Sequence, residues 1–315
     1  MGLLFLSSFF FISTINLAKA YTIENYQEKA EERLIISPTN LEMSLGTNES
    51  ITQNLIIINR LGRTAEFKIK FEDFTGSDDP NKSTVFLGEE TAGITSAKNW
   101  ISTEIDKITL NHGDRLNLPI TIKVPEGVEA GSHYVAVFAS VAGENKAEGQ
   151  QVVKLVSRVG TLILINVPGA NRESGEITEF KTDKKFYRNG PVNFSTVFKN
   201  TGNVYQKVRG KISVTNILGA QIAQIPVKDW VVLSNASRRQ AAEWDKKWIL
   251  GRYKAHLKVF YGLGGNLTDE NEVVFYAFPW HIALLILLIL IVIYYAFKYL
   301  FSKFEIRRRE EPKQF

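Results

Sequence analysis

The sequence contains no cysteine, and this absence limits what can stabilise the chain. Small exported proteins often depend on disulfides, so an exported chain without them must rely on its hydrophobic core. About 250 residues lie between the two most apolar segments of the chain, enough for two domains. Eukaryotic surface domains of the immunoglobulin (Ig) type usually carry a cysteine pair, so its absence favours a prokaryotic protein.

Motifs that carry catalysis or bind cofactors are also missing. The sequence has no cysteine nucleophile, no Gly-x-Ser-x-Gly elbow and no phosphate-binding loop. Four histidines lie far apart without metal-ligand spacing: His112, His133, His256 and His281. Four acidic residues would offer calcium its oxygen ligands, but without the spacing of a calcium loop they favour a solvated turn: Glu72, Asp73, Asp78 and Asp79. We therefore expect no catalytic residue, cofactor or metal, and no residue can be assigned to binding.

The first twenty residues are typical of a secretory signal peptide. An apolar run is followed by Ala18-Lys19-Ala20, a small-x-small ending that predicts cleavage before Tyr21. No Lys or Arg precedes the apolar run, so a buried strand and an uncleaved anchor stay open as alternatives. We expect residues 1–20 to be the signal and residues 21–32, rich in Glu and Gln, to be a loose leader.

A second apolar stretch near the other end predicts a membrane-spanning helix over residues 277–299. About 20 mostly apolar residues are needed to cross the hydrocarbon core. This stretch begins near Pro279, where a missing backbone N–H costs least. Aromatic residues that favour the membrane interface lie near both ends: Trp280, Tyr294, Tyr295 and Tyr299.

The charge of the tail gives the helix a direction. From Lys298 to Phe315 there are six basic and three acidic residues, which favours a cytoplasmic tail over residues 300–315 and an extracellular body. The chain as a whole carries +5; removing +3 for the tail and +1 for Lys19 leaves about +1 on the mature outer body. The pI of 9.1 therefore reflects the tail, and nucleic acid is not an expected partner.

The helix is expected to stay in the mature protein. A sortase signal would need a Leu-Pro-x-Thr-Gly type of site just before the span, and residues 274–280 contain none. The membrane itself is therefore the first expected partner, contacted by a single pass.

The body alternates apolar and polar residues with period two, which is typical of antiparallel sheet. The pattern is clear over residues 67–72, 115–124 and 252–259. A turn-rich run at residues 168–175 predicts a boundary between domains over residues 33–168 and 174–276. The predicted fold is all-β: two tandem Ig-like antiparallel β-sandwiches followed by a single transmembrane α-helix.

Several motifs, taken in order, resemble one bacterial family. They are Leu34–Ser37 with Pro38, Leu55–Asn59, Val124-Pro125-Glu126-Gly127, Gly131–Tyr134, Arg158–Leu164, Val167-Pro168-Gly169, Phe198–Val204 and Leu250–Tyr253. This order, the two-domain length and the C-terminal anchor resemble the DUF916 family, also described as WxL-interacting proteins. The resemblance implies a first domain associated with peptidoglycan and a second with host or matrix ligands, beside secreted WxL proteins. No binding residue of the family has a matching motif here.

Some smaller features have structural interpretations. Gly202 and Gly251 are expected to supply positive φ at turns. Trp248-Ile249-Leu250 spells W-x-L, but a tryptophan packed in the core is favoured over a WxL signature. An exposed aromatic and basic surface over Trp244–Trp248, with Lys246 and Lys247, is the alternative.

The sequence thus predicts a non-enzymatic, membrane-anchored bacterial surface protein. Its expected partners are a cell-wall polymer, peptidoglycan, and secreted surface proteins. A scaffold subunit of a larger membrane complex is one alternative, and an extracytoplasmic enzyme acting on the wall is a weaker one.

Overall fold

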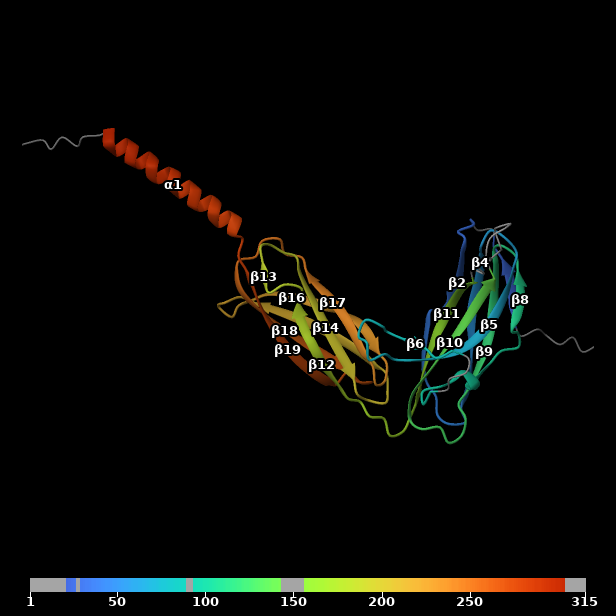
Figure 1. Cartoon of the computed structure of the whole chain (residues 1–315). Coiled ribbons are helices and arrows are strands. Elements are labelled where there is room, and N and C mark those ends of the chain that lie inside the picture. The colour runs from blue at the N-terminus through green and yellow to red at the C-terminus, as the bar shows by residue number, and fades with distance from the viewer. Residues whose placement is uncertain (1–20, 27–28, 89–92, 143–155, 304–315) are drawn as a thin grey trace, which may run out of the picture. The chain divides into compact units, whose positions relative to one another are not determined.

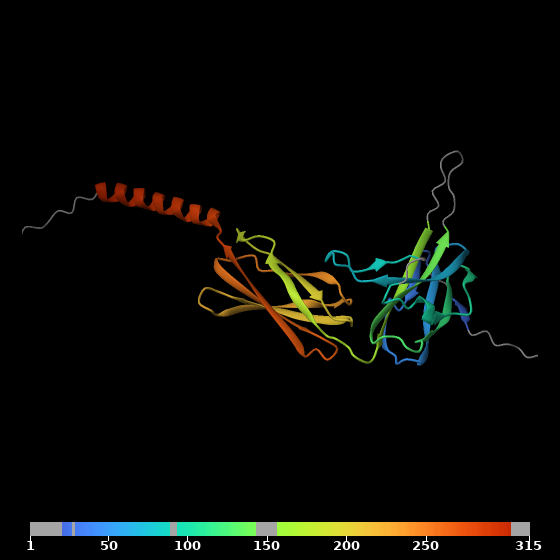
Figure 2. The ribbon, with the colours of Figure 1, turned by 60° about the horizontal axis from the view of Figure 1, so that its bottom comes forward.

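The computed structural model describes residues 21–26, 29–88, 93–142 and 156–303. Within these residues the chain is mostly β-strand, with a single apolar helix at its C-terminal end (Figures 1 and 2). The mainly β body and the C-terminal helix are confirmed. The predicted signal peptide and residues 304–315 of the predicted tail lie outside the described residues.

The chain forms two compact units that interleave along the sequence. The first holds residues up to Thr75 and from Thr84 to Arg172, and the second holds Gly76–Ser83 and the chain from Glu173 onward. The short segment 76–83 thus belongs to the second unit, although the residues before and after it belong to the first. The sequence had predicted a solvated turn at Asp78 and Asp79 but not its place in another unit.

The first unit is a sandwich of two sheets. One sheet has the order β1-β9-β4-β2, with β7 beside β9, and the other has the order β3-β11-β10-β5-β6, with β8 beside β5. The strands of the first sheet are β1 (Thr22–Asn25), β2 (Arg33–Ser37), β4 (Ser50–Arg60), β7 (Ile101–Ser102) and β9 (Asp114–Lys123). Those of the second are β3 (Asn40–Ser44), β5 (Ala65–Thr75), β6 (Val85–Phe86), β8 (Lys107–Leu110), β10 (Gly131–Ala142) and β11 (Val156–Val167), and the 3-10 turn η1 spans Lys98–Trp100.

Residue alternation places the core of this unit. In β9 every second side chain, from Leu116 to Ile122, is buried, as the period-two pattern predicts. In β10 all residues from Tyr134 to Ala139 are buried, because this strand lies between β11 and β5 and because Phe74 packs on Tyr134 and Phe86 on Phe138. A strand buried in this way has no polar face, so its sequence is a continuous apolar run.

The structure corrects the prediction of a loose leader over residues 21–32, because part of that segment is a strand. Residues 22–25 form β1, which pairs antiparallel with β9 in the register Ile23 opposite Leu116. Its side chains are all exposed, so the strand is held by its backbone pairing and by polar contacts such as Asn117 Nδ2 donating to Thr22 Oγ1 at 3.0 Å. The segment is ordered because it pairs with the open edge of a sheet. The composition of the segment gives no indication that such an edge is available.

The second unit also has two sheets. The three-stranded sheet has the order β12-β14-β17 and the five-stranded sheet the order β13-β19-β18-β15-β16. The strands of the first are β12 (Gly175–Thr182), β14 (Val192–Asn200) and β17 (Ser237–Trp244). Those of the second are β13 (Phe186–Tyr187), β15 (Gln206–Thr215), β16 (Gln221–Val232), β18 (Gly251–Tyr261) and β19 (Leu267–Ala277).

An aromatic cluster joins the two sheets of this unit. Phe194 on β14 meets Phe275 on β19 with ring centroids 6.0 Å apart. Trp244 on β17 meets Tyr253 on β18 at 5.5 Å, edge to face. Edge-to-face pairs at this spacing add about 1 kcal/mol each beyond the burial of their area. Rings of this size provide the core that the chain, lacking cysteine, must build without disulfides.

The Asn200–Asn203 motif has a different role from the one predicted. The segment joins β14 to β15, which belong to different sheets, so it is not a hairpin turn. Gly202 is not among the positive-φ glycines of the described residues, whereas Gly251 is, at φ 107° as predicted. Asn200 holds the crossing instead, because its side chain is fully buried and can hydrogen-bond to both segments.

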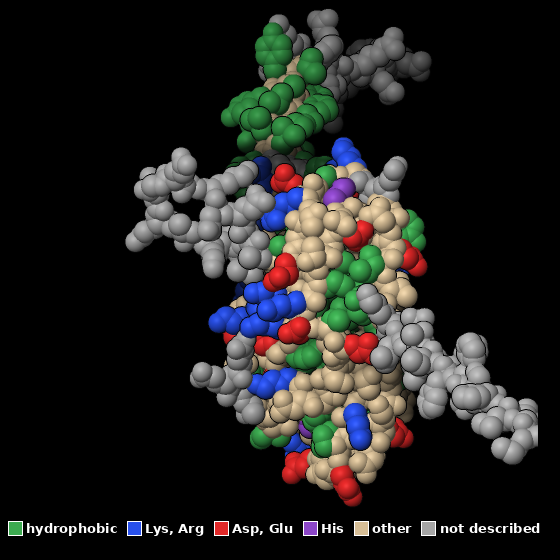
Figure 3. Space-filling model, turned by 90° about the vertical axis from the view of Figure 1, so that its right-hand side faces the viewer, with side chains coloured by type: hydrophobic (Ala, Val, Ile, Leu, Met, Phe, Trp, Pro, Cys, Tyr) green, Lys and Arg blue, Asp and Glu red, His purple; other side chains and the backbone are tan. Residues whose placement is uncertain are grey.

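The C-terminal helix α1 (Trp280–Lys303) is long and apolar enough to cross a membrane. Its window Leu284–Phe301 has a mean hydropathy of 2.5 and no buried residue, and apolar side chains cover it in Figure 3. The predicted span began at residue 277, but Ala277 still belongs to β19. The helix starts after Pro279, a residue that is tolerated at or before the first turn of a helix but not in its interior.

Candidate binding surface

The acidic residues singled out in the sequence are dispersed. Asp73 is fully buried and accepts hydrogen bonds from Ser96 Oγ and, at 2.8 Å each, from the backbone N–H of Ala97 and Lys98. Glu72 pairs with Arg158 at 3.0 Å. Each of these carboxylates is engaged locally, and the described residues contain no group of three or more His, Asp or Glu side chains that would hold a metal ion.

The histidines are likewise separate. His133 is buried against the ring of Trp100, with centroids 4.5 Å apart, and burial lowers its pKa. His256 Nε2 lies 3.2 Å from Glu270 on the neighbouring strand. These contacts are structural, and the side chain of His281 lies outside the described residues.

The Trp-Ile-Leu tripeptide corrects the sequence interpretation. Trp248 is 69% exposed and Leu250 66% exposed, while Ile249 between them is buried. The tryptophan packed in the core is Trp244, four residues earlier. The alternative of an exposed aromatic and basic surface therefore describes Trp248 correctly and Trp244 wrongly.

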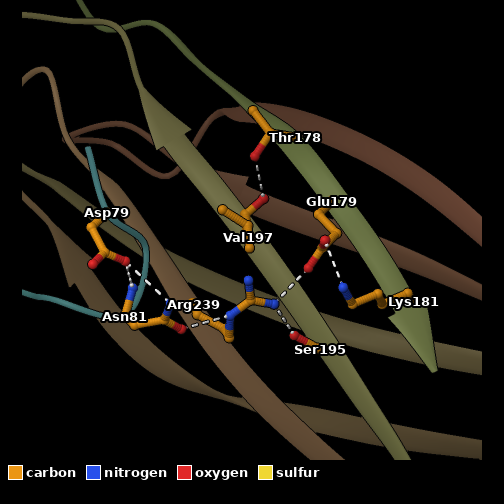
Figure 4. Close-up of polar contacts among 8 residues, drawn as sticks. All are labelled: Asp79, Asn81, Thr178, Glu179, Lys181, Ser195, Val197 and Arg239. Atoms are coloured by element: carbon orange, nitrogen blue, oxygen red, sulfur yellow. Dashed lines mark hydrogen bonds and ion pairs between the residues drawn. The ribbon is translucent and has the colours of Figure 1, made fainter. Parts of the chain in front are cut away.

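Arg239 is the centre of a polar cluster on the second unit (Figure 4). It lies on β17, opposite Val197 of β14, and its guanidinium Nη1 donates to Glu179 Oε1 at 2.5 Å and to Ser195 Oγ at 2.6 Å. Its Nε donates to Asn81 Oδ1 at 3.1 Å. Among the contacts that the structure describes, Nη2 takes part in none, so one edge of the guanidinium is available to a ligand.

Segment 76–83 completes the cluster. The free edge of β17 donates two backbone hydrogen bonds to it, from Ser237 N to Ser77 O at 2.9 Å and from Arg239 N to Pro80 O at 2.8 Å. This pairing covers a sheet edge that would otherwise expose its backbone groups. It also carries Asn81 to the guanidinium of Arg239.

A turn within the segment orients Asn81. Asp79 Oδ1 accepts from the backbone N–H of Asn81 at 3.0 Å and from its Nδ2 at 3.2 Å. With Nδ2 held in this way, Oδ1 faces Arg239 and serves as the acceptor. Asp79 therefore positions the side chain of Asn81.

Within the cluster, the Glu179 carboxylate accepts hydrogen bonds from two cations, Lys181 and Arg239. The hydrogen bond from Lys181 at 2.8 Å, followed by that from Arg239, lowers the pKa of Glu179 below its ordinary value. Beside it, Arg238 donates to Val231 O at 2.7 Å, and burial lowers its pKa. Three cations, Lys181, Arg238 and Arg239, against two carboxylates, Glu179 and Asp79, leave this surface with a positive excess.

A hollow of about 400 Å³ opens beside the cluster. It is open to solvent, and its lining residues are Pro80, Asn81, Ser83, Arg238, Arg239 and Ala241. A guanidinium, an amide and a hydroxyl suit a carboxylate or a polyhydroxylated ligand, because each forms directional hydrogen bonds with such groups. None of these lining residues is a histidine, cysteine or carboxylate that would act as a catalytic base or nucleophile.

The sequence did not predict this surface. Its residues come from four separate segments: 76–83, β12, β14 and β17. The one local signal is the pair Arg238-Arg239 inside an alternating strand, where one of two neighbouring cations must point toward the inner face.

No family model and no curated protein matches this chain. Among solved structures, a chain of the chaperone–tip adhesin complex of CFA/I fimbriae biogenesis is 10% identical, covering 78% of this chain and 99% of its own, with a TM-score of 0.39. The CupB2 chaperone of Pseudomonas aeruginosa is 8% identical (76% and 100% covered, TM-score 0.36), and the E. coli chaperone DraB is 11% identical (76% and 95%, TM-score 0.37). Likeness at these values carries no conclusion about function or family.

Proposed function

We propose that this chain is a membrane-anchored bacterial surface protein whose outer body binds cell-wall peptidoglycan or a secreted partner protein, without catalysis. In this proposal the two units are tandem Ig-like sandwiches, α1 crosses the membrane once, and the basic tail lies in the cytoplasm. The proposal keeps the resemblance to the WxL-interacting family as its family assignment.

The observation that carries the proposal is the open, polar hollow at Arg239. Peptidoglycan offers carboxylates on its peptide stems and hydroxyl and amide groups on its glycan, and a partner protein offers carboxylate side chains. The free edge of the Arg239 guanidinium suits a carboxylate, and Asn81 and Ser83 beside it suit amides and hydroxyls. The position of such a body on an apolar helix places any ligand close to the outer face of the membrane.

The test is retention of the detergent-solubilised full chain on purified insoluble peptidoglycan, and on a secreted-protein fraction from the same cells. The variant Arg239→Gln removes the charge but keeps donors. A charge-assisted hydrogen bond contributes about 1.5–3 kcal/mol, so we expect a loss of affinity of about tenfold or more.

A matched control is Arg209→Gln on the other sheet, where the arginine side chain is 67% exposed and 3.9 Å from Asp229. It removes the same charge away from the hollow and should leave retention unchanged. No retention of the unmodified chain on either material at physiological salt would refute the proposal. If the two variants are retained equally, the hollow at Arg239 is not the binding site.

A further inference from the structure

Exposed apolar residues gather at one end of the second unit. Eight large apolar residues are exposed on its described residues before α1, and six of them form what we term the apolar collar: Phe186, Ile217, Leu218, Trp248, Leu250 and Phe278. The other two, Leu263 and Leu267, lie at the turn between β18 and β19. Single exposed apolar residues are common on surfaces, but a cluster marks a binding surface.

The strand register places the collar at the end of the sheet from which α1 begins. Gly251, at the start of β18, pairs with Ala277 at the end of β19, and Phe186 pairs with Tyr276. Thr215, at the end of β15, pairs with Lys254, so the turn that carries Ile217 and Leu218 is at this end as well. The opposite end is one length of β18 away, eleven residues or about 35 Å.

Two of the collar's loops are fastened to each other. Gly190 N donates to Lys247 O at 3.0 Å, which joins the loop after β13 to the loop that carries Trp248. A Cβ at Gly190 would lie 2.0 Å from the carbonyl oxygen of Lys246, so the approach depends on glycine. The collar is therefore a fixed surface built on sheet ends.

Positive charge surrounds the collar. Residues 183–188 and 245–252 contain six exposed basic residues and two exposed acidic ones, a net charge of +4: Lys184, Lys185, Arg188, Lys246, Lys247 and Arg252 against Asp183 and Asp245. Apolar and aromatic side chains among basic ones are the composition that binds anionic lipid surfaces. A protein partner with an apolar core and acidic rim would match the same chemistry, so location must decide between them.

The location is fixed by the chain itself. Trp280 begins α1, and the apolar window starts at Leu284, four residue steps or about 6 Å further along the helix. The headgroup layer on each side of a bilayer is about 5–8 Å thick. The guanidinium of Arg188 lies 5.1 Å from the ring centroid of Trp280, so the loop after β13 reaches the depth of the headgroups when α1 crosses a membrane.

We propose that the apolar collar is a membrane-interface surface, with its rings and aliphatic side chains in the headgroup layer and its basic residues on anionic lipid phosphates. The collar thereby holds the second unit against the bilayer and limits its rotation about the start of α1. This inference requires α1 to span the membrane and is independent of what the hollow at Arg239 binds.

The absence of cysteine permits a direct test on the full chain. Single variants Trp248→Cys and Leu218→Cys are labelled with a fluorophore and reconstituted in phosphatidylcholine vesicles containing phosphatidylglycerol. The matched control Leu263→Cys is 51% exposed at the far end of the sheet. We expect lipids with a quencher on the headgroup to quench the labels at residues 218 and 248 and to leave the label at residue 263 bright.

A fourth variant, Leu290→Cys, reports insertion of α1 through quenching by lipids labelled in the acyl chain. If the label at residue 290 is quenched while those at 218 and 248 behave like the label at 263, the collar does not touch lipid and the proposal is wrong. If the label at residue 290 is not quenched, the span itself is wrong and the proposal fails with it. Neither result changes the test of retention on peptidoglycan, because that test depends on the hollow at Arg239.

The charges are tested separately. A basic residue near an anionic surface changes the population in contact about fivefold, so Lys246→Gln with Lys247→Gln should shift that equilibrium about 25-fold and reduce quenching at residue 218. Lys228→Gln on β16, exposed toward the far end of the sheet, is the control and should change nothing. Equal quenching in vesicles with and without phosphatidylglycerol would overturn the assignment of the basic residues to lipid phosphates.

Discussion

Replacement of Asn200 by alanine should destabilise the second unit more than any exposed substitution of the same kind. The Asn200 Nδ2 donates to the carbonyl oxygens of Val204, Val232 and Leu233 at 2.7, 3.1 and 3.0 Å. Its Oδ1 accepts from Gly202 N at 2.9 Å and from Gln206 Nε2 at 3.1 Å. One side chain thus satisfies buried groups on both sides of the crossing between the sheets.

The Asn200 Nδ2 group has two hydrogens, so one is shared between two carbonyl oxygens and the five contacts amount to about four hydrogen bonds. Each contributes about 1 kcal/mol net, and a buried group left without its partner costs about 1–3 kcal/mol. Asn200→Ala should therefore lower the free energy of unfolding by about 4–5 kcal/mol, a large part of the about 5–15 kcal/mol of a typical domain. Urea unfolding of the detergent-solubilised chain, followed by the fluorescence of the buried Trp230 and Trp244, measures it.

Asn216→Ala is the matched control. Asn216 also uses its side chain to hold a turn, accepting from Leu218 N and Ala220 N at 3.0 Å each, but it does so in contact with solvent. Water replaces those hydrogen bonds, so the expected loss is below about 1 kcal/mol. A loss for Asn200→Ala no larger than that for Asn216→Ala would show that the buried network contributes little.

Two further changes test segment 76–83 and the Arg239 cluster. Gly76→Ala places a Cβ 2.3 Å from the Cβ of Ala236, so it should cost about 1–3 kcal/mol and increase proteolytic cleavage within residues 76–83, unless the segment is not docked there. Glu179 has a lowered pKa in the folded chain, so its stabilising contribution is present above its unfolded pKa and is lost as the pH falls through the lower folded value. Melting temperatures of the unmodified chain and Glu179→Gln should therefore differ at about pH 6 and converge toward about pH 3, and a constant difference would contradict the ion pair.

The strands could be predicted where one face of a sheet is wet. In most of β9 and in β18 up to Val259, apolar residues alternate with polar ones and the structure buries the apolar set, so local sequence carries the information. The apolar length of α1 was equally plain. β1 was missed because Ile23 gains its place from pairing with a distant strand, which leaves no local periodicity.

The candidate sites needed tertiary information. Arg239 acquires its partners Ser195, Glu179 and Asn81 from positions 44, 60 and 158 residues away in the chain. No spacing rule links such residues. The same holds for Trp248. Trp248, Ile249 and Leu250 are all apolar, so the sequence carries no alternation there, although the structure exposes the first and third and buries the second.

The small net charge of the predicted outer body conceals an uneven distribution of charge. The predicted outer body carries only about +1, yet the segments around the apolar collar carry +4, so the rest of the body is about −3. An anionic bilayer surface attracts the basic segments around the collar and repels the acidic remainder of the body. Both effects favour an orientation with the collar toward the bilayer. Because the Debye length is about 8 Å at physiological salt, only charges beside the headgroups act strongly, and in the proposal those are the basic residues around the collar, such as Arg188 beside Trp280. Raising the salt concentration should therefore weaken the contact of the collar with anionic lipid while leaving the apolar insertion of α1 unchanged.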